Sequence, residues 1–282
     1  MQEIPISTWP EFETALANIR KEKRQREERT SRKFVDILFR GIGSSRWGIE
    51  TTLERSFPNE RCDKTFSLLQ YYRKATAVKP AVETLSGARW EGIRSFWDFK
   101  TQLQERPPMW LDVVLAEEVA LYEYLVYLRH HGFPSPLLDW TASPYVAAFF
   151  ALDAPPIEST HVSVFGFLQD SVHGGSSDAH FFIVGPYMRS HPRHVLQQCQ
   201  YSMCTRFLTN PIDYEFVPHE IGMADAAGPE GELFKIVIPV EQRVDALKSL
   251  DLMNITPTRC SDHRMGLSRP WPDGNVSSAN GD

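Results

Sequence analysis

The sequence predicts an α+β fold, with a helical N-terminal half packed on a mixed, mainly antiparallel sheet. Helical patterns dominate up to residue 152, whereas short runs of β-branched and aromatic residues cluster from residue 161 onward. Between these two parts, residues 145–152 form a segment that is apolar on every side of a helix. A helix of this kind belongs inside a domain, so we expect both parts to pack around it.

The stretch LLDWTASPYVAAFFAL, at residues 137–152, changes character at Asp139, Trp140 and Thr141. Ser143 followed by proline predicts a helix start, because serine can accept a free N–H of the first turn and proline has none to lose. The helix dipole and the free N–H groups would favour an anionic ligand there. Alternatively, Asp139 and Thr141 only cap the turn and Trp140 fills the core.

The N-terminal part predicts a first helix with Thr8 as its N-cap and Glu11 in a capping-box position, running towards Lys21. A strongly basic segment from Arg20 to Lys33 follows, with eight basic and three acidic residues. Such a segment is either a solvated helix end or linker, or a strip that binds a polyanion. The overall net charge of −6 argues against a dedicated nucleic-acid binder.

The segment FVDILFRGIG, at residues 34–43, alternates as a strand does and ends near Gly41. Arg40 would then lie at the end of a buried strand, where a charged side chain needs a partner. A guanidinium suits a carboxylate or a diphosphate, so Arg40 either forms an internal salt bridge or binds a ligand. Residues 44–55 are expected to form a loop.

The remaining elements follow from the same patterns. An irregular, aromatic-rich helical region is expected at residues 65–112, and a helix from Asp112 to His131 that Gly132 ends. Further strands are predicted at residues 161–168, 179–184, 201–208 and 233–239, and a helix at 241–253. We therefore divide the chain into an N-terminal helix and basic linker (1–33), a main domain (34–257) and an irregular tail (258–282).

From the composition we expect a cytoplasmic protein that does not cross a membrane. The four cysteines have neither disulfide-framework nor zinc spacing, the N-terminus does not resemble a secretory signal, and no apolar run approaches the roughly 20 residues that cross a bilayer. We find no metal-binding constellation, Gly-rich phosphate loop or nucleophile elbow. We therefore predict no metal.

Three separated motifs resemble the FRG domain family. FRGIGSSRWGIETTLERS, from residue 39, resembles the F/Y-R-G motif after which the family is named, and LRHHGFPSPLLDWTASPYVAAFFA resembles its LLDWTxSP motif. PRHVLQQCQYSMC, from residue 192, is similar to an R-x-x-x-Q segment. The chain departs from the family at Arg129, where glutamine is usual, and at Ser135–Pro136, where the family has Thr-Arg.

The order of these motifs is similar to that of ADP-ribosyltransferases with an R-S-E constellation, which implies an ADP-ribosyltransferase-like core and NAD as substrate. The positions that match are Arg40, Thr141 and Gln197, with Glu220 as the nearest acid that could replace the usual glutamate. The implied catalytic residues are therefore Arg40, Thr141, Gln197 and Glu220. The implied cofactor-binding residues are Arg40, Gly41, Asp139, Trp140, Thr141 and Ser143.

The resemblance implies an enzyme that transfers ADP-ribose to a protein or nucleic acid, or that hydrolyses NAD, of a toxin or phage-defence type. Gln197 keeps hydrogen bonding but lacks the negative charge that stabilises an oxocarbenium-like centre. One alternative is therefore a non-catalytic, nucleotide-sensing or interaction module. Another is a nucleic-acid-associated protein that uses the segment from Arg20 to Lys33. We expect Arg40→Ala to abolish ligand binding without unfolding the chain.

Overall fold

A computed structural model describes residues 1–30, 34–56, 65–105, 119–153, 155–156, 158–170, 179–184, 197–209, 212–227 and 233–257. The structural statements below concern these ranges. The expected tail at 258–282 and the first residues of the helix expected from Asp112 lie outside them.

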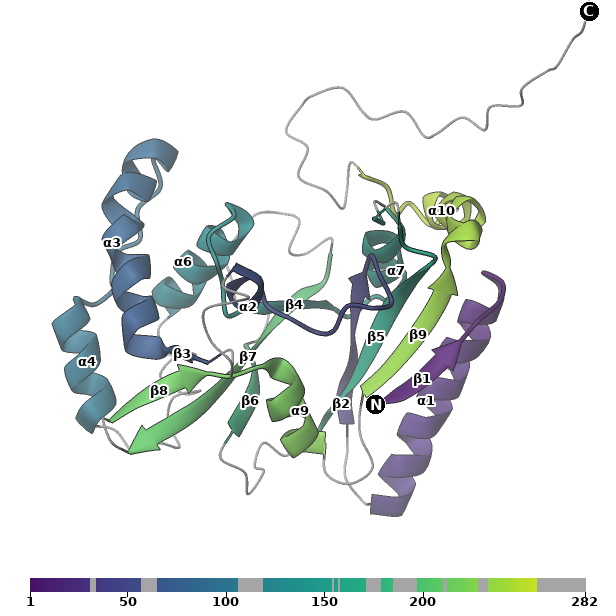
Figure 1. The fold of residues 1–282 in the computed structure, drawn as a ribbon, viewed down its shortest axis with the longest axis horizontal. Helices are drawn as coiled ribbons and strands as arrows, with labels where there is room; N and C mark the ends of the chain where they lie inside the picture. The colour runs from purple at the N-terminus through teal and green to yellow at the C-terminus, as the bar shows by residue number, and fades with distance from the viewer. Residues whose placement is uncertain are drawn as a thin grey trace, which may run out of the picture.

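The centre of the molecule is a nine-stranded sheet (Figure 1). Its strands are β1 (Gln2–Pro5), β2 (Phe34–Ile42), β3 (Phe66–Ser67), β4 (Leu138–Thr141), β5 (His161–Asp170), β6 (Ala179–Val184), β7 (Cys199–Thr209), β8 (Ile212–Phe216) and β9 (Leu233–Pro239). They follow the order β1-β9-β5-β2-β4-β7-β8-β3, and β6 pairs with β7 off this path. The pairing of β1 with β9 is parallel, whereas the others are antiparallel. The predicted α+β class and mixed, mainly antiparallel sheet are confirmed.

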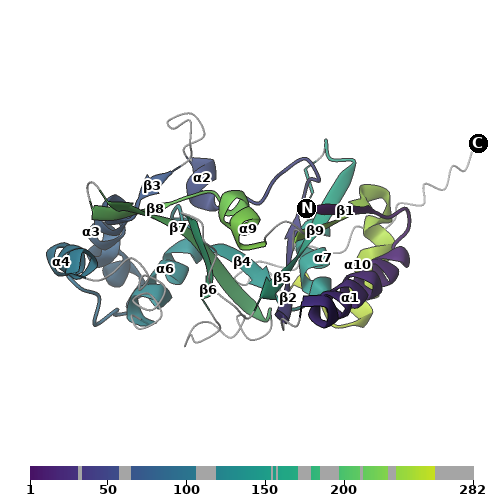
Figure 2. The same ribbon diagram turned by 90° about the horizontal axis from the view of Figure 1, so that it is seen from below.

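The helices gather on two sides of the molecule. They are α1 (Glu11–Thr30), α2 (Thr52–Ser56), α3 (Leu68–Ser86), α4 (Phe96–Glu105), α6 (Val119–His130), α7 (Pro144–Leu152), α9 (His219–Ala227), the 3-10 turn η3 (Val240–Gln242) and α10 (Arg243–Leu252). In Figure 1, α3, α4 and α6 lie beside β3, β7 and β8, and α1, α7 and α10 lie beside β1, β5 and β9. Figure 2 shows α9 between these two parts. The short strand β4 connects the two parts, because it pairs with β2 on one side and β7 on the other.

Each part has its own apolar core. Side chains of α3, α4 and α6 bury against β7 and β8, and side chains of α1, α7 and α10 bury against β2, β5 and β9. A third group, here called the central cluster, lies between them. It consists of Leu38, Ile42, Ile49, Leu138, Trp140, Phe165, Phe167 and Met223. The two parts therefore form one continuous sheet with packed side chains between them.

Helix α7 starts as its sequence predicts. Ser143 has an extended backbone, and its hydroxyl accepts the backbone N–H of Val146 at 3.3 Å. Seven of its nine residues are buried, which explains why the helix is apolar on every side. The predicted buried helix is confirmed.

The first strand, β1, was not predicted from the sequence. Strand β1 at the N-terminus pairs with β9, more than 200 residues away, and a four-residue strand at an edge carries too weak a periodic signal to be recognised. Helix α2 also occupies residues where a loop was expected. Its capping box, Thr51 followed three residues later by Glu54, can be recognised in the sequence. In the structure the backbone N–H of each of these residues donates to the side chain of the other at 3.2 Å.

Candidate anion-binding site

Arg40 lies on β2, at the place where α7 packs most closely on the sheet. Its two neighbours point to the opposite side of the strand. Phe39 is buried in the core around α7, and a Cβ on Gly41 would overlap with the carbonyl oxygen of Ala147. The glycine of the F-R-G motif therefore allows the backbones of β2 and α7 to touch, and this contact fixes the direction in which Arg40 points.

Arg40 faces the central cluster and reaches towards β4. Its Nη1 donates to the carbonyl oxygen of Asp139 at 2.9 Å, and it lies 3.7 Å from Asp139 Oδ2. Arg129, in the last turn of α6, donates to both carboxylate oxygens of the same aspartate through Nε and Nη2. Two guanidinium groups thus share one carboxylate. The sequence left open whether Arg40 forms an internal salt bridge, and the structure shows that it does.

The electrostatics of this group are unusual because both arginines are buried. Their side chains are 12% (Arg40) and 9% (Arg129) exposed, whereas the Asp139 side chain is 40% exposed. Burial opposes ionisation of Asp139, but the charges of Arg129 and Arg40 outweigh it and lower the pKa of Asp139 to about 2. Burial lowers the pKa of Arg40 to about 10, so this guanidinium stays charged at neutral pH.

Positive charge exceeds negative charge at this place. Arg40 and Arg129 have no ion-pair partner other than Asp139 among the residues that the structure describes, and the charge of Arg55, on α2, also acts on Arg40. In addition, Nε of Arg40 is buried and has no hydrogen-bond partner within the described ranges. A buried donor without a partner is costly, so this nitrogen is a candidate contact for a bound group.

The polar residues of the LLDWT motif hold the turn after β4. The Thr141 hydroxyl donates to the carbonyl oxygen of Gln197 at 2.6 Å and accepts the N–H of Ser143 at 3.0 Å. Trp140 is buried, and its Nε1 donates to the Ser202 hydroxyl at 2.7 Å. These contacts give Thr141 and Trp140 structural roles. Their contact with a ligand stays a prediction.

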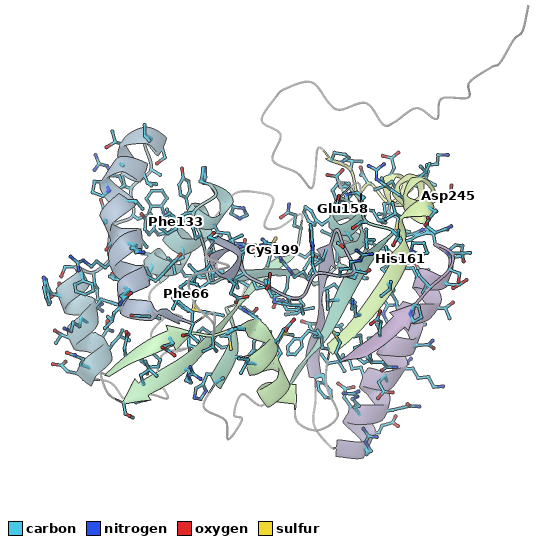
Figure 3. All side chains as sticks on the ribbon, viewed as in Figure 1. Phe66, Phe133, Glu158, His161, Cys199 and Asp245 are labelled. Atoms are coloured by element: carbon cyan, nitrogen blue, oxygen red, sulfur yellow. The ribbon has the colours of Figure 1, made fainter. Side chains whose placement is uncertain are left out.

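The structure places the backbones of Arg40, Thr141 and Gln197 near the β2–β4 junction, but the Thr141 side chain is on the face of the sheet that Phe39 occupies, opposite to Arg40. Phe39, next to Arg40, pairs with Thr141 across β2 and β4, and Thr141 contacts Gln197 at the start of β7. The Gln197 side chain accepts the thiol of Cys199 at 3.1 Å. Figure 3 places Cys199 near the middle of the molecule, between Phe66 and His161. The proposed third catalytic position therefore lies close to the β2–β4 junction.

Glu220 lies on a different element, in the first turn of α9, and is exposed. Its carboxylate is beside Gly48, where a Cβ would have no room. The preceding residue, His219, is buried, and neither ring nitrogen makes a hydrogen bond of acceptable geometry with the described residues. Burial lowers the pKa of His219 to about 3 against the effect of the Ser202 backbone, and the charges of Arg40 and Arg129 lower it further.

Two residues of this region were not predicted as site residues. In the sequence, Arg129 replaces the glutamine that is usual in the family. That replacement was the signal that could have paired Arg129 with the Asp139 carboxylate. His219 gave no such signal, because a single histidine at the start of a short helix is indistinguishable from a core residue in sequence. Arg129 reaches this region through Asp139, ten residues later, and His219 reaches it from a distant part of the chain.

The described ranges contain neither a metal-binding cluster nor a membrane-spanning helix. No group of three or more His, Cys, Asp or Glu side chains there is arranged to hold a metal ion. No helix there is both long enough and apolar enough to cross a membrane.

The fold and the site define an α+β protein with a buried arginine pair on one aspartate at the centre of its sheet. The FRG domain family model matches residues 35–159, which include β2, β4 and α7. The chain is therefore an FRG domain-containing protein. No curated protein matches the chain, and no solved structure does.

Proposed function

We propose that the site around Arg40 binds the diphosphate of NAD or a related dinucleotide, and that the protein transfers ADP-ribose or hydrolyses NAD. In this reaction the bond between ribose C1′ and the nicotinamide nitrogen breaks, and the electron pair leaves with neutral nicotinamide. C1′ then bonds to water or to a nucleophile of an acceptor, which releases a proton to solvent. The acceptor is a protein or a nucleic acid.

The observation that carries the proposal is the pair of buried guanidiniums on one carboxylate, with Arg40 Nε left without a partner in the described part of the chain. A diphosphate offers several oxygens for charge-assisted hydrogen bonds, and a guanidinium can bind two of them at once. The Asp139 side chain is 40% exposed and that of Arg40 12%, so solvent reaches this group mainly at the carboxylate. An anion at this place would compensate the excess positive charge.

The catalytic part of the proposal depends on Gln197 and Glu220. Gln197 lies beside Thr141, where its amide could hydrogen-bond a ribose hydroxyl. Glu220 would supply the negative charge that stabilises an oxocarbenium-like transition state. For this role the carboxylate would have to leave its place beside Gly48. Catalysis would then require a movement of α9 or of the loop that precedes α2.

The test measures NAD binding and nicotinamide release by the full chain. Arg40→Lys keeps the charge but loses the planar fork, so binding is expected to weaken by about tenfold or more, and release with it. Arg89→Lys, at an exposed arginine after α3, is the matched control and should change neither. Wild-type protein that binds neither NAD nor inorganic pyrophosphate would overturn the proposal.

A second function is supported by one observation. The residue whose backbone contacts Thr141 is Gln197, which carries a neutral amide, and the acid proposed for catalysis, Glu220, is on another element. A module that binds a dinucleotide without cleaving it needs no acid at this place. If the protein binds NAD tightly but releases no nicotinamide, either alone or in the presence of candidate acceptor proteins or nucleic acids, this function would be established in place of the enzymatic one.

A further inference from the structure

Three buried polar groups lie on the same side of the sheet without a hydrogen bond of acceptable geometry in the described ranges, although the Ser202 backbone is near His219. They are Nε of Arg40, the hydroxyl of Ser163 and both ring nitrogens of His219. Buried polar groups in folded proteins are almost always hydrogen-bonded, so a concentration of exceptions in one region needs an explanation. Ser163 and His219 have no part in the function proposed above.

The pairing of the strands places Arg40 and Ser163 on one face. Arg40 pairs with Phe165 and Ile42 pairs with Ser163, and side chains at paired positions point to the same side of an antiparallel sheet. Ile42 and Phe165 are both in the central cluster, so this side is the one that faces the cluster. Arg40 and Ser163 therefore point into the same region.

Helix α9 covers this region. Met223 belongs to the central cluster, and His219 is one helical turn before it, on the same side of the helix. The His219 ring lies 6.0 Å from the Phe181 ring, which in turn is 5.0 Å from Phe167 of the cluster. The charges of both Arg40 and Arg129 act on His219. His219 is therefore on the side of α9 that faces the central cluster, the region into which Arg40 also points.

From this geometry we infer that His219 is a specificity residue of the dinucleotide site and hydrogen-bonds an uncharged polar group of the nucleoside part. The inference rests on the proposed function. A neutral imidazole has one N–H donor and one acceptor nitrogen, which fits a hydroxyl or a carboxamide. The arginines hold the anionic part of the ligand, whereas His219 distinguishes a dinucleotide from a simple diphosphate, with Ser163 as a second neutral contact.

The experiment compares binding of NAD and of inorganic pyrophosphate by wild-type protein, His219→Phe and Arg40→Lys. His219→Phe removes two unpartnered nitrogens but keeps a ring of similar size, so its thermal stability should equal or exceed that of the wild type. NAD binding should weaken by about tenfold, because the nucleoside group loses its partner, and pyrophosphate binding should not change. Arg40→Lys should weaken both ligands.

His219→Gln is the second variant, since it keeps a donor and an acceptor at a similar reach. It should bind NAD more tightly than His219→Phe, and it provides the comparison if the phenylalanine variant does not fold. Equal NAD affinity in the wild type and in folded His219→Phe, or binding by His219→Gln that is no tighter than by His219→Phe, would overturn this inference while leaving the proposed function in place. Absence of binding of both ligands to the wild type would overturn the proposed function and this inference with it.

Discussion

Arg129 and Asp139 form a two-pronged ion pair that connects the last turn of α6 with β4. The pair joins the helical part of the molecule to the strand that connects the two parts of the sheet. Nη1 of Arg129 also donates to the Thr52 hydroxyl at 3.3 Å, which adds α2 to the same group. Arg129 therefore connects two consecutive elements, α6 and β4, with α2, which lies 77 residues earlier in the sequence.

Replacing Arg129 by glutamine, the residue usual in the family, should destabilise this chain. Asp139 would keep Arg40 but lose both hydrogen bonds of the fork. Removing one partner of a buried pair is costly, and the 40% exposure of Asp139 reduces that cost, so we expect about 1–3 kcal/mol in urea denaturation. Arg206→Gln is the control, because Arg206 is 37% exposed whereas Arg129 is 9% exposed, so its pair with Glu215 should contribute below about 1 kcal/mol. Equal losses in the two variants would show that the fork contributes no special stability.

Gly41→Ala should destabilise the fold strongly. A methyl group at this position would overlap with the carbonyl of Ala147 and lie 2.7 Å from the N–H nitrogen of Ala151, so α7 would have to move away from β2. We expect a loss of about 3 kcal/mol or more, typical of overpacking against backbone. Gly43→Ala is the matched control two residues later, where the nearest atom is 3.3 Å away in a proline side chain. A Gly41 variant as stable as the Gly43 variant would contradict this packing role.

The stability of the protein should fall as pH decreases from about 6.5. The pKa of His219 is lowered to about 3 in the folded state, so between these values the unfolded chain takes up a proton that the folded chain excludes. Above pH 6.5 the imidazole is neutral in both states, and on acidification the buried His219 destabilises the fold with a slope of at most about 1.4 kcal/mol per pH unit. Denaturation of His219→Phe between pH 4 and 7 should show a smaller dependence on pH than the wild type. An unchanged dependence would mean that His219 titrates normally.

Gln197→Glu should separate the catalytic proposal from simple binding. The substitution supplies the negative charge that the family resemblance associates with catalysis, at a position whose backbone carbonyl is already fixed by Thr141. We expect nicotinamide release to rise by about tenfold with little change in NAD affinity. Conversely, Gln197→Ala should reduce release more than binding. Equal effects on both quantities would show that this side chain has no role specific to the transition state.

The basic segment on α1 can be tested by charge removal. Helix α1 packs its apolar face into the core, so deletion of the N-terminal region would also remove buried side chains such as Phe12 and Leu16. Arg26 is buried and paired with Glu22, and Lys23 is paired with Glu27. We therefore propose the triple replacement of the exposed Arg20, Lys21 and Arg24 by glutamine. If the segment binds a polyanion, affinity for single-stranded DNA or RNA should fall and depend less on salt. No difference would favour a solvated helix face.

Local patterns predicted the elements whose signals are strong. The alternation around Arg40, the serine–proline start of α7 and the apolar runs of β5 and β9 all correspond to elements in the structure. Each of these signals is contained in a few consecutive residues. Helix α1 extends to Thr30, so residues 20–30 of the basic segment form a helix end, as one of the two expectations had it, because polar residues with i, i+4 ion pairs continue a helix without an apolar pattern.

The partners within the site could not be predicted in the same way. That Arg40 needs a carboxylate follows from its burial, but the choice of Asp139 among the 36 acids depends on the pairing of β2 with β4. The burial of His219 depends on how α9 lies over the central cluster, which no local pattern encodes. The sequence therefore identifies which residue types carry charge, and the tertiary pairing decides which of them meet.

The pairing of β2 has a practical consequence for truncated forms of this protein. The family match ends at residue 159, two residues before β5 begins, yet β5 forms seven register pairs with β2 and lies between it and β9. A fragment restricted to residues 35–159 would expose one edge of the strand that carries Arg40 and uncover the side of α7 that packs on β5. Such an open edge is prone to aggregation. The region that homology delimits is thus smaller than the unit that can fold, and attempts to isolate it should retain the strands on both sides of β2.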